Sequence, residues 1–233
     1  MTAQSDMRNI LLRKMPSHEF LTISGNLEQV DLEYRKTLYR SDERIRSIYF
    51  PESGIASIVS ILDDGQMIEA GVAGRDGMVG VPVVLGVEAA PTECFVQSPG
   101  VGWRIDASVF RAALEHSPGL HGFFLRYVMA YLGQVTQTTA CNGVHTVLQR
   151  LARWLLVIHD RCEGDRMMLT QETIATCLGV RRAGVTEAAG ALQKAGAIAY
   201  AKGVITVVDR AALEAMSCEC YGAVKRQYDR LGF

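Results

Sequence analysis

The sequence predicts an α+β protein: an N-terminal β jelly roll, a long helix for dimerisation, and a C-terminal winged helix-turn-helix. Three observations lead to this fold class. Short β-rich runs fill residues 27–105, the hydrophobic period becomes helical from Asp106 onward, and two short helical patterns followed by a hairpin pattern occupy residues 169–208. The expected division follows these changes. It is a β-rich domain at 1–116, a helix at 117–142, a winged helix-turn-helix domain at 143–215 and a tail at 216–233.

The N-terminal prediction rests on short strands separated by turn sequences. The Asp64-Gly65 pair between two apolar runs is a strong hairpin signal. Many short, evenly spaced strands favour a sandwich or jelly roll over a parallel sheet. The strand-like runs cover residues 46–50, 55–62, 67–72, 93–97 and 102–105.

The long helix is expected to begin at Ser117-Pro118 and to run to about Cys141, roughly 25 residues or about 37 Å. Apolar or small residues recur in it at alternating spacings of four and three, as in a coiled-coil seam. The expected seam residues are Phe124, Val128, Tyr131, Val135 and Thr138. We interpret the helix as the junction between two copies of the chain, the alternative being a helix packed wholly within one subunit.

The next pattern is typical of a winged helix-turn-helix. Thr170 is expected to cap a first helix that ends at Gly179, and a second helix is expected from Arg181 to about Ala195. Two short strands around the Lys202-Gly203 turn would form the wing. This order of parts favours DNA binding over a winged helix used only for protein contacts.

Residues 169–208 resemble the helix-turn-helix of the Crp/Fnr superfamily, the bacterial regulators related to catabolite activator protein. The sequences at 49–54 and 74–80 resemble turns of that family's cyclic-nucleotide-binding-like jelly roll, and the resemblance covers roughly residues 9–215. It implies a cytoplasmic transcription regulator that acts as a homodimer. Its expected partners are double-stranded DNA, a second copy of the chain and RNA polymerase.

The resemblance also implies which residues contact DNA. The second helix of the motif would enter the major groove, while the first helix and the wing would contact phosphates. The expected base contacts are Arg181, Arg182, Gly184, Val185, Thr186 and Glu187, and the expected phosphate contacts are Thr170, Gln171 and Lys202. Arg182 matches a base-contacting arginine of the family. Ala183 and Glu187 depart from catabolite activator protein, so its operator sequence is not transferred.

An effector pocket is expected somewhere in the region from Met78 to Glu93, with an unknown effector and no cofactor. Cyclic-AMP binders of the family carry a Gly-Glu pair followed by an Arg-Ser pair in this region. Here Val81 follows Gly80, and no arginine lies between Arg75 and Arg104. A cyclic phosphate would therefore lose its hydration without gaining a cation, and cyclic AMP is not the expected effector.

The sequence predicts no metal site. Six cysteines are scattered along the chain, and Cys218-Glu219-Cys220 matches no common zinc spacing, so free thiols are expected. The iron–sulfur cluster of the Fnr branch needs cysteines near the N-terminus, and none precedes Cys94. Four histidines in helical sequence are expected to be packed or solvated rather than to bind haem. They are His116, His121, His145 and His159.

Composition excludes some functional classes. No apolar run is long enough for a membrane span, and no export signal is visible, so neither a membrane location nor a disulfide framework is expected. A cupin-like metalloenzyme would need histidines on its strands, and none lies between His18 and His116. We expect no enzyme. The remaining alternative is a ligand-binding or protein-interaction module that no longer binds DNA specifically.

Overall fold

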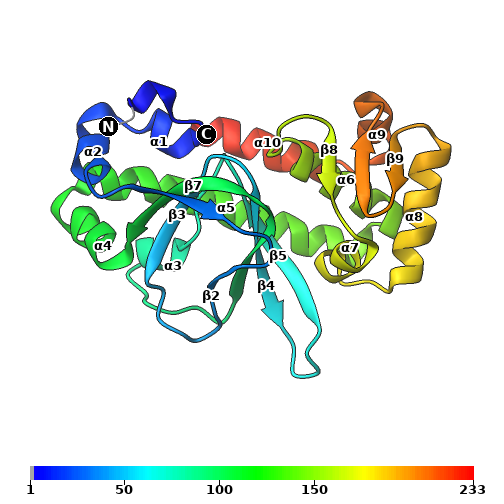
Figure 1. Ribbon diagram of the computed structural model, residues 1–233, viewed down its shortest axis with the longest axis horizontal. Helices are drawn as coiled ribbons and strands as arrows, with labels where there is room; N and C mark the ends of the chain where they lie inside the picture. Colours follow the sequence, from blue (N-terminus) through cyan, green and yellow to red (C-terminus); the bar gives the residue numbers. More distant parts are fainter. Residues whose placement is uncertain (1–2) are drawn as a thin grey trace. The chain divides into compact units, whose positions relative to one another are not determined.

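The computed structural model describes residues 3–233, which form two compact units (Figure 1). Unit 1 comprises the chain up to Ile58 together with Val72–Leu132 and Tyr228–Phe233. Unit 2 comprises Val59–Gly71 and Gly133–Gln227. Among the described residues, no helix has both the length and the apolar character that a bilayer crossing requires.

Two antiparallel sheets build the β-rich N-terminal part of the chain, as the jelly-roll prediction requires. One has the strand order β1-β7-β3 and the other β2-β6-β4-β5. In the first sheet Ile48 pairs with Ile105 and Phe50 with Trp103. The strands are β1 (Glu28–Leu32), β2 (Thr37–Tyr39), β3 (Ser47–Pro51), β4 (Ile55–Ile61), β5 (Met67–Ala73), β6 (Glu93–Ser98) and β7 (Gly100–Asp106). Strands β1 and β2 were absent from the sequence-predicted runs because β1 is mostly polar and exposed and β2 has only three residues.

Short helices and an aromatic cluster complete unit 1. The rings of Phe50, Phe110 and Phe124 pack together, with 5.0 Å between the centroids of Phe110 and Phe124. Asp106 caps α4, because its side chain accepts a hydrogen bond from the backbone N–H of Ser108 at 2.7 Å. The short helices are η1 (Gln4–Asp6), α1 (Ile10–Lys14), α2 (Ser17–Ser24), α3 (Val81–Val84) and α4 (Ala107–His116).

The long helix α5 (Pro118–Val144) exists, but one predicted seam residue is wrong. Phe124 is fully buried within its own unit, where it completes the aromatic cluster and is not available to a second chain. The outward apolar stripe lies one residue further along, at Leu125, Met129 and Leu132, which are 41%, 51% and 52% exposed. Both neighbouring stripes are apolar, so spacing alone did not distinguish the inward one from the outward one.

Besides the C-terminal part of α5, unit 2 contains the predicted helix-turn-helix and three further helices. Thr146 and Gln149 form a reciprocal capping box at the start of α6, whose apolar face is buried. A small sheet of order β8-β10-β9 forms the wing. The elements are α6 (Val147–His159), β8 (Arg166–Met168), α7 (Gln171–Leu178), α8 (Arg182–Lys194), β9 (Ile198–Ala201), β10 (Val204–Val207), α9 (Arg210–Met216) and α10 (Cys220–Leu231). The predicted tail is therefore mostly helical.

Candidate nucleic-acid interface

The first helix of the motif, α7, has a defined start and a sharp end. The Thr170 side chain accepts a hydrogen bond from the backbone N–H of Thr173 at 3.1 Å. Gly179 follows the helix with φ 60° and ψ 42°, the left-handed conformation that glycine adopts without a steric penalty. This turn directs the chain into α8 after only a few residues.

The second helix, α8, has one buried face and one exposed face. Val185, Ala188, Ala189 and Leu192 are buried within unit 2. Val185 was predicted as a base contact, and this is wrong because its side chain is fully buried in the apolar core of the motif. Gly184 is half-buried beside α6. The exposed members of the predicted set are Arg181, Arg182, Thr186 and Glu187.

Gln171 joins the starts of the two helices. Its side-chain oxygen Oε1 accepts hydrogen bonds from Nε of Arg182 and from the hydroxyl of Thr186, each at 3.2 Å. The Thr186 hydroxyl also lies 3.1 Å from the backbone carbonyl of Arg182. Gln171, expected only as a phosphate contact, therefore also orients the arginine that the sequence singles out for base contact.

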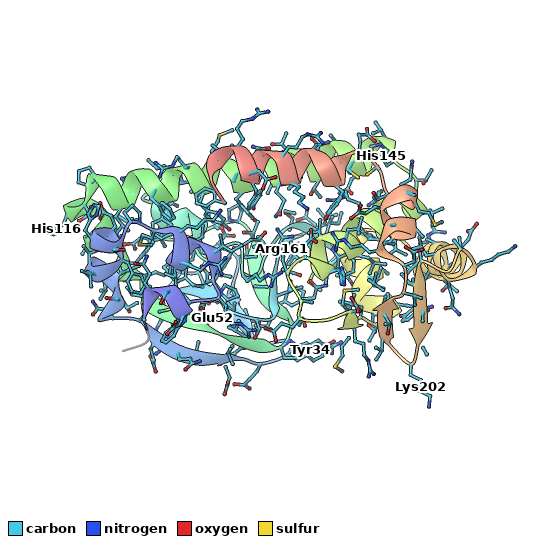
Figure 2. The ribbon with its side chains drawn as sticks, turned by 90° about the horizontal axis from the view of Figure 1, so that it is seen from above. Tyr34, Glu52, His116, His145, Arg161 and Lys202 are labelled. Carbon is cyan, nitrogen blue, oxygen red and sulfur yellow. The ribbon has the colours of Figure 1, made fainter. Side chains whose placement is uncertain are left out.

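The wing places a cation at an exposed tip. Lys202 has φ 50° and Gly203 has φ 76°, as expected for the two central residues of a type I′ hairpin turn. Ala201 and Val204 form the pair that closes the hairpin. In Figure 2 the Lys202 side chain extends from the end of the wing into open space.

A groove of about 420 Å³ brings several of these side chains together within unit 2. It contains all three predicted phosphate contacts and Arg182, but not Arg181, Thr186 or Glu187. Its lining residues are Thr170, Gln171, Arg182, Tyr200, Ala201, Lys202 and Gly203. The arrangement offers a guanidinium, an ammonium, an amide and a hydroxyl to one anionic surface.

Tyr200 is a groove residue that the sequence analysis missed. Its hydroxyl donates a hydrogen bond to the backbone carbonyl of Leu169 at 3.1 Å, which fixes the ring between wing and helix. Burial raises the pKa of Tyr200, while the charge of Arg182 acts in the opposite direction. The sequence signal that could have identified Tyr200 is its position in the predicted wing, two residues before Lys202.

The region expected to hold an effector is mainly apolar, with a packed first part and an exposed turn at residues 85–88. Met78, Val83 and Val84 are buried, and the Met78 backbone N–H donates a hydrogen bond to the Tyr127 hydroxyl at 3.1 Å. Gly80, in the left-handed region, precedes the short helix α3. The side chains of this short helix therefore contribute to the core of unit 1 rather than to a polar phosphate cradle.

Arginines from elsewhere in unit 1 do approach this region. Arg44 and Arg111 both pair with Glu88, beside a cavity of about 360 Å³ that is also lined by Val83 and Asp106. The hydrogen bond from Arg111 lowers the pKa of Glu88, and the charge of Arg44 acts in the same direction. Both guanidinium groups are therefore already paired with this carboxylate.

A separate group of metal-ligating side chains lies in unit 2. It gathers Cys141, His145, Cys218 and Cys220, with Cys141, Cys218 and Cys220 packed as one buried cluster. The cysteines are free thiols, as expected, but spacing did not show that three of them meet His145 at the end of α5, because they lie far apart in the sequence.

Comparison with known families assigns two segments of the chain. Residues 149–216 match the Crp-like helix-turn-helix domain, and residues 29–117 match the cyclic nucleotide-binding domain. The chain belongs to the Crp/Fnr family. The family resemblance predicted from the sequence is confirmed, and this Crp/Fnr-type transcription regulator carries a helix-turn-helix DNA-binding domain. No curated protein sequence matches the chain.

Solved structures of Crp/Fnr proteins share the fold. FixK2 from Bradyrhizobium japonicum matches with a TM-score of 0.71 and 16% identity, over 82% of this chain and 98% of its own. A putative regulator of the Crp/Fnr family from Eubacterium rectale matches with a TM-score of 0.68 and 18% identity, over 90% and 98%. TTHB099 from Thermus thermophilus, a regulator of the CRP family, matches with a TM-score of 0.66 and 20% identity, over 81% and 96%.

Proposed function

We propose that this Crp/Fnr protein is a homodimeric, sequence-specific DNA-binding transcription regulator of the cytoplasm, with RNA polymerase as a further partner. The observation that carries the proposal is the groove in which Gln171 holds Arg182 beside the wing. An exposed arginine at the start of a recognition helix can bind O6 and N7 of guanine with two hydrogen bonds. Because Gln171 already holds the Arg182 guanidinium, this side chain would lose less conformational freedom when DNA binds.

The other groove residues suit contacts with phosphate. Thr170 and Gln171 lie at the start of α7, where backbone N–H groups and the helix dipole favour an anion. Lys202 at the wing tip supplies a cation without base specificity. Arg181, Thr186 and Glu187 are exposed beside Arg182 and complete the proposed base-reading set.

The dimer would form along α5. Three exposed apolar residues, Leu125, Met129 and Leu132, recur at spacings of four and three on its outward face. Val128, Tyr131, Val135 and Thr138 of the predicted seam are half-buried and would flank this stripe. A dimer would place two copies of α8 about 34 Å apart, one turn of DNA, on an inverted repeat.

The jelly roll is proposed to sense something other than cyclic AMP, or only to support the DNA-binding part. The expected cassette has apolar, buried side chains at Val83 and Val84, and the nearby Arg44 and Arg111 are paired with Glu88. A cyclic phosphate would have to displace that carboxylate to gain a cation.

Selection of bound sequences from a random DNA pool, with the protein free of added ligand, tests this function. Recovery of an inverted repeat by wild type but not by Arg182→Ala supports a specific dimeric regulator. Equal recovery by both proteins would remove Arg182 from the interface. If an intact dimer enriches no sequence, and still enriches none when cell extract metabolites are supplied, the chain is instead a module without specific DNA binding.

A further inference from the structure

Three cysteines and one histidine converge at the C-terminal end of α5, within unit 2. Sγ of Cys141 lies 3.5 Å from Sγ of Cys218, and Sγ of Cys220 lies 3.7 Å from Nδ1 of His145. All four ligand atoms lie within 4.8 Å of one another. Cys141, Cys218 and Cys220 are each less than one-twentieth exposed, so the group is enclosed.

Helix geometry aligns the first two ligands. Gln137, Cys141 and His145 are spaced by four residues, which places them on one face of a helix. The backbone N–H of His145 donates to the carbonyl of Cys141 at 3.1 Å, so the helical turn extends to the histidine. In Figure 2 His145 marks this end of α5, beside the first turn of α10.

The other two ligands come from the connection between α9 and α10. Helix α9 ends at Met216, and Cys220 is the first residue of α10, so Cys218 lies in the short link between them. One residue separates the two cysteines, and both thiols reach the same group. The sequence spacing is unusual for zinc, but the turn compensates by bringing the thiols together.

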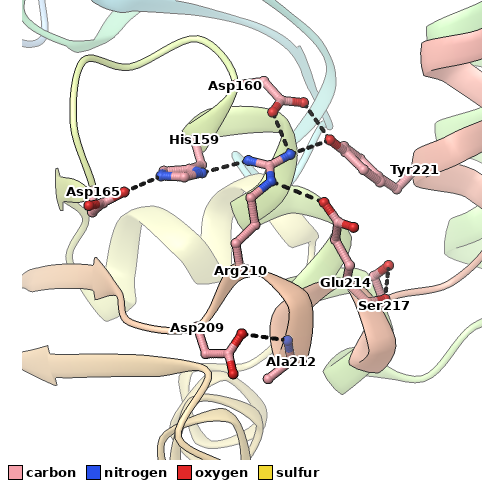
Figure 3. Close-up of polar contacts among 9 residues, drawn as sticks. All are labelled: His159, Asp160, Asp165, Asp209, Arg210, Ala212, Glu214, Ser217 and Tyr221. Carbon is pink, nitrogen blue, oxygen red and sulfur yellow. Dashed lines mark hydrogen bonds and ion pairs between the residues drawn. The ribbon is translucent and has the colours of Figure 1, made fainter.

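A polar network holds this connection in place (Figure 3). Arg210 at the start of α9 donates hydrogen bonds to Asp160 at 2.7 Å and to the Tyr221 hydroxyl at 2.5 Å. The Tyr221 hydroxyl in turn donates to Asp160 at 2.8 Å, and Arg210 also donates to Glu214 at 3.0 Å. The residue next to Cys220 is therefore fixed to the end of α6, which makes the position of the thiol well defined.

We propose that Cys141, His145, Cys218 and Cys220 bind one thiophilic divalent metal ion, zinc being the best fit, in a tetrahedral Cys3His site. Zinc bonds of about 2.3 Å to sulfur and about 2.0–2.1 Å to nitrogen give ligand-to-ligand distances of about 3.5–3.8 Å in a tetrahedron. The Cys141–Cys218 pair at 3.5 Å and the Cys220–His145 pair at 3.7 Å lie within that range. Four atoms this close together leave room for one ion, not for an iron–sulfur cluster with its bridging sulfides.

The surroundings of the ligands have the form expected around a metal ion. The Glu219 carboxylate lies 3.3 Å from Nε2 of His145, and this leaves Nδ1 to face Cys220. Histidine ligands commonly hold a carboxylate on their second nitrogen in this way. Gln137 donates a hydrogen bond from Nε2 to Sγ of Cys220 at 3.0 Å, which would stabilise a thiolate.

The charge balance gives an independent argument. Arg150 and Arg153 of α6 are both buried, and among the described residues Nε of each has no hydrogen-bond partner. Each guanidinium interacts electrostatically with Cys141. A zinc ion with three thiolates and a neutral imidazole carries a net charge of about −1. Such a site would offset part of the positive charge of these two neighbouring buried guanidinium groups, which neutral thiols do not offset.

Four protein ligands leave no open position, so the ion would be structural rather than catalytic. It would tie the end of α5 to the α9–α10 link and close a loop of the chain that contains the whole helix-turn-helix. The inference is independent of the proposed function, because its test measures metal and not DNA.

The test uses the full chain, expressed in zinc-supplemented medium and purified under reducing conditions without chelator. We expect about one zinc ion per chain by elemental analysis. After zinc is replaced by Co²⁺, we expect thiolate-to-cobalt charge-transfer absorption and the visible bands of tetrahedral cobalt. Cys218→Ser and His145→Gln should each lose these bands and most of the bound metal, while the control Cys162→Ser should keep both.

A graded variant distinguishes a metal site from simple packing. Glu219→Gln removes the charge behind His145 but no ligand, so its zinc affinity should fall about 10-fold in a competition with a coloured chelator. Circular dichroism checks that each variant is folded. The proposal is overturned if the folded wild type holds no zinc, or if folded Cys218→Ser keeps it. It is also overturned if mass spectrometry finds a Cys141–Cys218 disulfide in metal-free protein and the protein still binds no metal once this disulfide has been reduced.

Discussion

Oε1 of Gln171 lies 3.2 Å from Nε of Arg182, although the two residues begin different helices of the motif. The hydrogen bond uses Nε and leaves the terminal nitrogens of the guanidinium for a partner. These are the nitrogens that form paired hydrogen bonds with guanine. In the proposed function, this contact would hold Arg182 in position to read a base before DNA binds.

Arg182→Ala should weaken binding to the selected operator by about 1–3 kcal/mol and relax the preference at one base pair of each half-site. The loss follows from removal of the paired hydrogen bonds to one guanine. Fluorescence anisotropy with the operator and with single-base variants measures it. Lys225→Ala, an exposed charge on α10, serves as the control and should bind as wild type. Unchanged specificity in the Arg182 variant would contradict the assigned role.

Lys202→Ala should weaken binding to all DNA sequences nearly equally. Its ammonium group at the wing tip would contact phosphate, which carries no sequence information. The plot of log affinity against log salt should become shallower by about one unit. A titration series at several salt concentrations gives the slope. A sequence-dependent loss with an unchanged slope would instead indicate a base contact.

Met129→Glu should convert the proposed dimer into a monomer. A carboxylate in the centre of the exposed apolar stripe would lie against its counterpart in a second chain and lose hydration. Light scattering coupled to gel filtration, at micromolar concentration, reports the mass. Leu21→Glu is the matched control, because Leu21 is exposed on α2 outside the stripe. If the Met129 variant remains dimeric, the interface lies elsewhere.

Arg210→Ala should lower the free energy of unfolding by about 1–3 kcal/mol. The substitution removes the donor shared by Asp160, Glu214 and Tyr221, and the half-exposed Asp160 loses the cation beside it. Urea unfolding followed by circular dichroism measures the change. Arg210→Lys keeps the charge but only part of the hydrogen bonding, and an intermediate value is expected. Equal stability of all three proteins would show that the network contributes little.

Cyclic AMP should neither raise the melting temperature nor change operator affinity. A bound ligand stabilises the folded state according to its concentration relative to Kd, so millimolar nucleotide gives a sensitive test. The reason is the apolar cassette around Val83 and the pairing of Arg44 and Arg111 with Glu88. A concentration-dependent shift, absent in Arg111→Ala, would show that the carboxylate can be displaced.

The sequence by itself determined the fold class, the family and the order of the parts. Local signals were sufficient for this: the Asp64-Gly65 hairpin, the Thr170 cap and the Gly179 turn each act over a few residues. The same local signals located Arg182 at the start of the second helix of the motif. Its linkage to Gln171 and the inclusion of Tyr200 in the groove depend on side-chain packing between elements.

Only the tertiary structure decided the features that depend on long-range contacts. Spacing predicted one apolar stripe on α5 that begins at Phe124, but packing against Phe50 and Phe110 decided that Phe124 faces inward, while Met129 on the neighbouring stripe faces outward. The metal-ligating group is the clearest case, because Cys141 and Cys218 are 77 residues apart. Sequence spacing describes ligands on one local segment. A site assembled from a helix end and a distant turn becomes visible only when the chain is folded.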